Sequence, residues 1–180
     1  MSGITNIKDI ARGGMGTQEV IDVLLIAESD FTAVTIDWPL RSDISGTGEI
    51  TTAIPITGGV QLPQIKFAIQ KGKSAAKKEA GAGPGYEVYN HDGLVGEMVG
   101  SAKEQWLSMD LLNNMPVVAI ARYPDGKRRV FGSLRVPLQV IFEEMSGVDG
   151  ATLKVEFRTT GKHNFMPPFL ATGVAVTLKA

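Results

Sequence analysis

Residues 117–133, VVAIARYPDGKRRVFGS, carry the clearest structural signal in the chain. An apolar run rich in β-branched residues, 117–123, is followed by PDG (124–126) and then by a second run, 127–133. Asp-Gly is a preferred turn dipeptide, and proline is favoured just before it. The pattern predicts an antiparallel β-hairpin. The basic residues 127–129 follow the turn, where exposed charge deters pairing with another sheet edge.

Strand-like segments continue on both sides of this hairpin. Segments 152–160 and 65–70 alternate apolar and polar residues with the period of two that a half-buried strand requires. Segment 20–27, VIDVLLIA, is short, apolar and β-branched, so we predict a buried strand, with a helix as the competing interpretation. Further extended pieces are expected at 31–38, at 134–145 beyond a break at Pro137, at 174–178, and as two short pieces within 87–100 joined by Asp92-Gly93.

A single helix is predicted over about residues 101–113. Ser101 is a suitable N-cap, and Glu104 three residues later completes the capping-box pattern. Apolar residues then recur at helical spacing, and Trp106 and Leu107 are expected to anchor the helix on the sheet.

These elements predict a mainly β fold. Successive hairpins imply antiparallel pairing, so we expect an antiparallel β-sandwich or barrel with one flanking α-helix. The 180 residues fit a single domain, 1–180, with an N-terminal arm at 1–19 and an extended loop at 71–86.

The composition narrows the functional classes. The chain has 18 basic and 19 acidic residues, a net charge of −1, which argues against a dedicated nucleic-acid-binding protein. It has no cysteine, which excludes disulfides and thiolate chemistry. The apolar run 23–27 is too short to span a bilayer, and the first residues lack a signal-peptide core, so we expect a soluble protein made in the cytoplasm.

Two glycine clusters, RGGMG (12–16) and GAGPG (81–85), invite a phosphate-loop interpretation. Neither has the glycine spacing of a P-loop or of a dinucleotide-binding turn, and the residues after 85 look extended rather than helical. We therefore interpret GAGPG as a loop tip and expect no cofactor.

The two histidines are the other candidates for chemistry. His91 lies beside Asp92 and near Tyr89, where a general base can be imagined, but His163 is far away in sequence. Two histidines without cysteine match no metal-site template. We interpret both as surface residues of turns or hairpins, and we nominate no catalytic residue and no metal ligand.

The lysine-rich run that precedes GAGPG is interpreted as a solvated arm. Four lysines within eight residues could follow a nucleic-acid backbone, but Glu79 interrupts them and aromatic residues for base stacking come only at Tyr86 and Tyr89. A loop of this length in a compact domain indicates either a function or disorder.

The order of these features resembles that of tail-tube and related virion structural proteins of tailed bacteriophages. The resemblance covers about residues 65–170. It rests on the helix segment SAKEQWLSMDLLNN (101–114), the hairpin PDGKRRVFGS (124–133), the strand GVDGATLKVEFR (147–158) and the segment MPPFL (166–170).

The resemblance implies a virion protein that assembles into hexameric rings, which stack into a tube that conducts the genome with at most non-specific contact. Its partners would be copies of itself and other virion proteins, with no membrane and no enzymatic activity. Segments 1–19 and 71–86 would then be arms that reach the next subunit. The interface residues expected on the second arm are Lys71, Lys73, Lys77, Lys78, Gly83 and Tyr86.

Two alternatives stay open. A head–tail connector, tail terminator or capsid-decoration protein would share the β-rich core and form one ring, or none alone. A β-barrel module that binds a small ligand would place GAGPG and the YNH tripeptide at 89–91 around the mouth of a pocket.

Overall fold

The computed structural model describes residues 19–33, 37–80, 87–100, 103–113, 115–147 and 150–178. Its strands are β1 (Asp22–Ala27), β2 (Glu49–Ile50), β3 (Gln64–Lys66), β4 (Lys77–Ala80), β5 (Glu87–Asn90), β6 (Leu94–Val99), β7 (Pro116–Arg122), β8 (Arg128–Phe131), β9 (Leu138–Gly147), β10 (Gly150–Thr159) and β11 (Phe169–Leu170). The helices are α1 (Lys103–Leu112) and two short 3₁₀ turns, η2 (Glu28–Asp30) and η3 (Arg41–Asp43).

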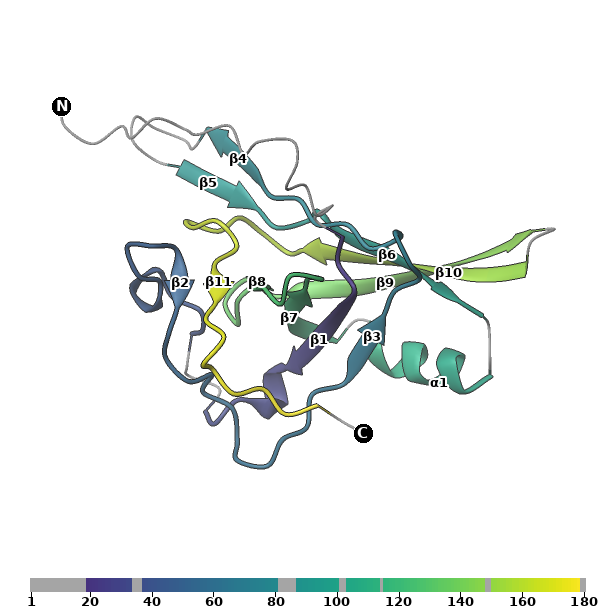
Figure 1. Cartoon of the computed structure of the whole chain (residues 1–180), viewed down its shortest axis with the longest axis horizontal. Helices are drawn as coiled ribbons and strands as arrows, with labels where there is room; N and C mark the ends of the chain where they lie inside the picture. The colour runs from purple at the N-terminus through teal and green to yellow at the C-terminus, as the bar shows by residue number, and fades with distance from the viewer. Residues whose placement is uncertain are drawn as a thin grey trace.

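Nine of these strands form one curled sheet (Figure 1). Its order is β2-β11-β8-β7-β9-β10-β6, and β1 joins it by pairing with β7 and β3. The strands β4 and β5 form a separate two-stranded sheet. A mainly β, largely antiparallel fold with one α-helix confirms the predicted fold class.

The predicted central hairpin is confirmed as β7 and β8, which pair from Ala119↔Phe131 to Arg122↔Arg128. Its turn is closed by the N–H of Gly126, which donates to the carbonyl of Tyr123 at 3.0 Å. Gly126 has φ +80°, a backbone conformation that side-chain-bearing residues rarely adopt. The Asp125-Gly126 dipeptide therefore forms the turn that the sequence predicted.

The strands β1 and β7 form a central wall with apolar residues on both faces. They pair along the whole of β1, from Asp22↔Arg122 to Ala27↔Val117. Successive side chains of a strand point to opposite faces, and here both faces are covered. Val23 and Leu25 belong to one buried cluster, whereas Leu24 and Ile26 belong to the other. This double coverage explains why VIDVLLIA reads as a continuous apolar run.

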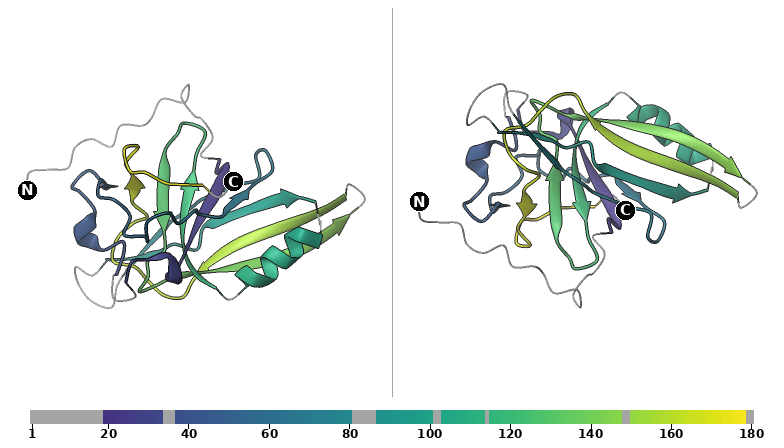
Figure 2. Two further views of the ribbon diagram at one scale, coloured as in Figure 1. Left: turned by 90° about the horizontal axis from the view of Figure 1, so that it is seen from below. Right: turned by 90° about the horizontal axis from the view of Figure 1, so that it is seen from above.

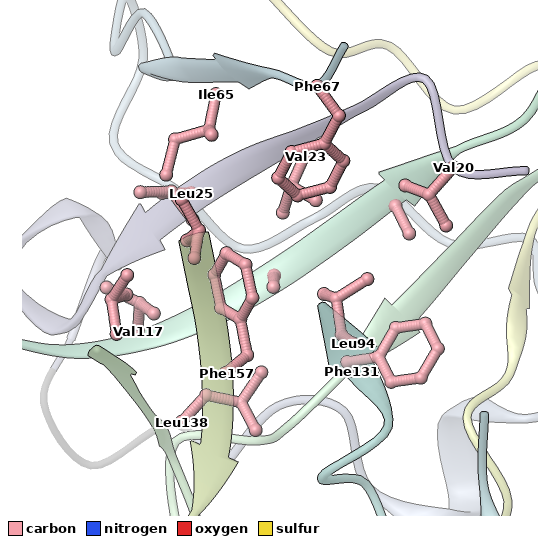
Figure 3. Close-up of a cluster of buried hydrophobic side chains, with 14 of the residues drawn as sticks. Val20, Val23, Leu25, Ile65, Phe67, Leu94, Val117, Phe131, Leu138 and Phe157 are labelled. Carbon is pink, nitrogen blue, oxygen red and sulfur yellow. The ribbon is translucent and has the colours of Figure 1, made fainter. Parts of the chain in front are cut away.

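The first of these clusters is filled by aromatic and branched side chains from strands far apart in the sequence (Figure 3). Phe131 of β8 and Phe157 of β10 are both fully buried. Gly96 of β6 lets Phe67 approach closely, because a Cβ at that position would lie 2.4 Å from the phenyl ring. Burial of each such large apolar side chain contributes about 1.5–3 kcal/mol to stability.

The strands β9 and β10 form a long hairpin, here called the ribbon, which extends away from the body of the sheet (Figures 1 and 2). The strands pair from Thr159↔Leu138 at the body to Gly150↔Gly147 at the far end. The predicted alternation in β10 is confirmed, since Leu153, Val155 and Phe157 are fully buried. The helix α1 runs beneath the ribbon in Figure 1.

The prediction for Leu107 is wrong. Leu107 is 59% exposed and Leu111 is 75% exposed, whereas Met109 is buried. Residues two apart in a helix do not face each other, whereas residues four apart do, so Leu107 and Leu111 share the outer face. Trp106 belongs to α1, but its side chain lies outside the described part of the structure.

Other expected strands are shorter than predicted or lie elsewhere. Within 31–38 only an isolated bridge, Phe31↔Ile56, is formed among the described residues. The strand expected at 65–70 is only Gln64–Lys66. Beyond it the chain turns, with Gln70 at a positive φ of 62°, and Ile69 is 87% exposed. The last strand is Phe169–Leu170 rather than 174–178.

The two extended pieces around Asp92-Gly93 exist but do not pair with each other. The strand β5 pairs with β4, and β6 pairs with β10, so the chain passes from one sheet to the other at this turn. The Asp92 carboxylate accepts the N–H of Thr159 at 2.5 Å, which ties the turn to the base of the ribbon.

Candidate functional site

The predicted arm at 71–86 is, in its described part, an ordered chain rather than a solvated loop. Lys73 exchanges two backbone hydrogen bonds with Val95, at 2.7 and 3.0 Å. The N–H of Val20 donates to the carbonyl of Gly72. From Lys77 the chain forms β4, which pairs with β5. The expectation of a solvated loop is therefore wrong for residues 71–80, because Gly72, Lys73 and Ala75 make backbone hydrogen bonds to the body and β4 pairs with β5 in a separate two-stranded sheet. A contact of this segment with a neighbouring subunit stays a prediction.

The four lysines of this segment are exposed to solvent, as expected, although the backbone that carries them is ordered. The Lys71 ammonium lies 2.9 Å from the Glu97 carboxylate. Lys73, Lys77 and Lys78 are also exposed, and the last two lie on β4. A neighbouring molecule can reach all four lysines. The other two predicted interface residues, Gly83 and Tyr86, lie outside the described residues.

The outer half of the ribbon presents an open strand edge. On its inner side β9 pairs with β10 throughout, but β7 pairs with β9 only at Leu138 and Gln139. A single further bridge joins Asn113 to Val140. From Ile141 to Gly147, no described strand occupies the outer edge of β9. An edge of this kind can add a strand from another chain.

Charged side chains cover the outward face of the ribbon. The Lys154 ammonium lies 2.6 Å from Glu156 and 3.7 Å from Glu143. Arg158 contributes a further bond to Glu156 at 3.0 Å. The hydrogen bond that Lys154 donates to Glu156 raises the pKa of Lys154, and the hydrogen bonds that Glu156 accepts from Lys154 and Arg158 lower the pKa of Glu156. This face is therefore charged and solvated at neutral pH.

The interpretation of both histidines as surface residues is wrong. His91 is fully buried and His163 is 3% exposed. Their rings stack with centroids 3.8 Å apart and an interplanar angle of 5°, and Phe165 meets both edge-on. The stacking follows from a backbone bridge between Tyr89 and His163, which brings the two chain segments together.

The hydrogen bonds of the pair define its tautomers. His91 Nδ1 accepts the N–H of Gly132 at 3.1 Å, so its proton is on Nε2, which donates to the carbonyl of Phe165 at 3.0 Å. His163 Nε2 donates to the carbonyl of Val136 at 3.1 Å. Its Nδ1 is consequently an acceptor, and it is buried without a partner in the described structure.

Both histidines are neutral at physiological pH. Burial, with a smaller contribution from the charge of His163, lowers the pKa of His91 to about 3. Burial likewise lowers the pKa of His163 to about 4. A pKa this far below 7 makes each ring a weak base near neutral pH.

The basic run at 127–129 also differs from its prediction, since Lys127 is exposed but Arg128 and Arg129 are half-buried. Arg128 donates to the carbonyls of Val174 and Ala171, and Arg129 donates to that of Pro167. The Arg129 guanidinium also lies 4.9 Å from the centroid of the Phe169 ring. The two arginines hold the C-terminal segment against the edge of β8. That edge is therefore covered by the chain's own C-terminal segment, and not protected by exposed charge as predicted.

A partly buried ion pair between Asp22 and Arg122 is the main polar feature that sequence reasoning missed. Asp22 is 4% exposed, and Arg122 donates two hydrogen bonds to its carboxylate, of 2.5 and 2.6 Å. Gln64 adds a third at 2.7 Å. These three residues join β1, β7 and β3. The only hint in the sequence was an aspartate inside an apolar run.

Among the described residues, no group of three or more histidine, aspartate or glutamate side chains could hold a metal ion. No helix in that part of the chain is long and apolar enough to cross a membrane. No protein-family model, curated protein or solved structure matches the chain.

Proposed function

We propose that this chain is a non-enzymatic virion structural subunit of the tail-tube type of tailed bacteriophages. In this proposal copies of the chain form rings that stack into a tube and conduct the genome, and the resemblance implies that each ring is a hexamer. Its partners are other copies and other virion proteins. The near-neutral balance of 18 basic and 19 acidic residues is a mild departure from the proteins that the chain resembles, whose tube lumen is often acidic.

The open outer edge of β9 is the observation that carries the proposal. Unpaired strand edges favour uncontrolled aggregation, and natural proteins keep them short or covered. Here the edge runs from Ile141 to Gly147 on a ribbon that extends from the body (Figure 2). Ring formation would cover it by adding a strand from the neighbouring subunit.

Two further surfaces support an assembly role. The outer face of α1 presents Leu107 and Leu111 to solvent, and the end of β6 presents Val99 at 73% exposure. On the other side of the molecule, β4 and β5 form a hairpin apart from the main sheet (Figure 1). These three exposed apolar side chains and the separate hairpin are available for contacts with another subunit.

Proline substitution at the edge tests the proposal. Successive N–H groups of a strand point to opposite edges, so one of Glu143 and Glu144 directs its N–H to β10 and the other directs it outward. Proline at the outward position keeps the ribbon and blocks strand addition. Of Glu143→Pro and Glu144→Pro, one should retain the stability of the wild type and lose assembly in sedimentation.

The matched control is Gln139→Ala, an exposed position on the part of β9 that already pairs with β7. It should assemble like the wild type. Normal assembly by both proline variants would show that the edge of β9 is not a subunit contact, and the proposal would lose its principal support.

A further inference from the structure

A cavity of about 450 Å³ opens beside the histidine pair. Three segments far apart in the sequence form it: residues 37–42, the turn at 133–136 and residues 162–165. The turn is fastened to the first segment, since the N–H of Leu134 donates to the carbonyl of Trp38 at 3.0 Å. A preformed hollow of this volume is in the range that holds a small molecule.

The rim of the cavity has an excess of positive charge. Arg41, Arg135 and Lys162 line it, against one carboxylate, Asp37. Lys162 is already paired with Glu79 at 2.7 Å, and Asp37 accepts the backbone N–H of Arg135 at 3.2 Å. In the described part of the chain, the guanidinium of Arg135 has no acidic partner. Arg41 has only a long contact, 3.5 Å, with the carbonyl of Ile44.

The floor is buried and polar. Ser133 is 4% exposed, and its hydroxyl oxygen accepts the N–H of Val136 at 3.1 Å. Its own O–H therefore stays available as a donor. His163 also lines the cavity, and Phe165 adds an apolar wall. Walls that exclude water strengthen a charge-assisted hydrogen bond made inside them.

We propose that this cavity is a binding site for a carboxylate or phosphate group, held by the guanidinium groups of Arg41 and Arg135 and by the hydroxyl of Ser133. Guanidinium presents parallel N–H groups whose geometry matches the two oxygens of a carboxylate or phosphate. The buried hydroxyl supplies one further donor. The site does not depend on assembly, so it stands whether or not the chain forms rings.

Calorimetric titration of the full chain at pH 7 with citrate, and separately with pyrophosphate, tests the site. We expect saturable binding of one probe per chain. Arg135→Gln and Arg41→Gln should each weaken binding about tenfold or more, the loss of one charge-assisted hydrogen bond. The control is Arg158→Gln, an exposed arginine on the ribbon, which should change affinity less than about twofold.

Each variant is first compared with the wild type in thermal unfolding without a probe. Because Arg41 and Arg135 are exposed, unchanged midpoints are expected, and a lost affinity then reports the site. Binding that does not saturate, or that Arg158→Gln weakens as much as Arg135→Gln does, would overturn the proposal in favour of general ionic attraction.

Titration before and after assembly distinguishes two sources of the bound group. A free ligand should bind equally to single chains and to assembled particles. A carboxylate supplied by a neighbouring subunit should exclude the probe from particles while single chains still bind it. Both results require the site, and binding to single chains is measured independently of the proposed tube.

Discussion

The central wall and the outer ribbon are built from the same kind of strand, yet they differ in what covers them. In β7, residues 117–121 are completely enclosed by clusters on two faces, and neighbouring strands occupy both edges. In the outer part of β9, Glu143 and Glu144 are exposed and the outer edge is free of described strands. Stability therefore resides in the wall, whereas the open edge of the ribbon is where the proposed contact with another subunit would form.

Acidification should give the largest change in the free energy of unfolding, through the two buried histidines of the body. The folded-state pKa values of His91 and His163, about 3 and about 4, lie below the ordinary value of 6.5. Between pH 6.5 and 4 the unfolded chain therefore binds more protons than the folded chain, and stability falls as the pH is lowered. The loss approaches about 1.4 kcal/mol per pH unit for each histidine.

Urea unfolding at several pH values measures this slope. The lowered pKa of Glu156 on the ribbon acts only at lower pH, so the slope between pH 6.5 and 5 should come from the histidines. His163→Asn should remove about half of it. Unfolding free energy that stays constant between pH 6.5 and 5 in the wild type would contradict the buried, neutral pair.

Identical leucine truncations should give very different results in the two regions. Leu24 in the wall is 1% exposed, and Leu24→Ala should lower the free energy of unfolding by about 2–5 kcal/mol because it leaves a cavity. Leu111 on the outer face of α1 is 75% exposed, and Leu111→Ala should change it by about 0.5 kcal/mol or less. Equal effects in chemical denaturation would refute the assigned burial.

Glycine substitutions probe the packing between β6 and the body. The Cβ of alanine at position 96 would meet the Phe67 ring at 2.4–2.5 Å, so Gly96→Ala should cost about 1–3 kcal/mol. Gly46 has nothing within 4 Å of the same atom, and Gly46→Ala should be neutral or slightly stabilising. Thermal unfolding of both variants measures this difference. A midpoint for Gly96→Ala equal to that of Gly46→Ala would contradict the close packing of β6 against Phe67.

A small effect on stability is also expected at the lysines of segment 71–80. The Lys71–Glu97 ion pair is half exposed on the lysine side, at 52%, so Lys71→Ala should change the free energy of unfolding by less than about 1 kcal/mol. If Lys71 contacts a neighbouring subunit, the same variant should nevertheless weaken assembly in sedimentation. A large loss of stability would show that the lysine is structural instead.

Local signals predicted the parts of the fold that local chemistry controls. The hairpin β7–β8 was predictable because its turn residues and nearly all of both strands lie within 117–133. The helix α1 and the strand β10 were predictable from their own periodicity. The exposure of Leu107 was not predictable, because apolar residues lie on two faces of the helix and only the packing shows which face is buried.

The candidate sites were harder to predict because they depend on contacts between distant segments. His91 and His163 stack although many strands separate them along the chain, and no local pattern announces that contact. The lysine run looked like a solvated loop, yet its backbone pairs with Val95 and with β5. The open edge of β9 likewise emerges only from knowing where β7 stops pairing.

Negative-stain electron microscopy of the purified chain over a concentration series, with light scattering for mass, tests the central proposal most directly. Tubes of uniform width or stacked rings that increase with concentration are the predicted result. Discrete rings that never stack would contradict the tube and favour a connector or terminator. Particles that stay monomeric at the highest concentration would contradict self-assembly altogether.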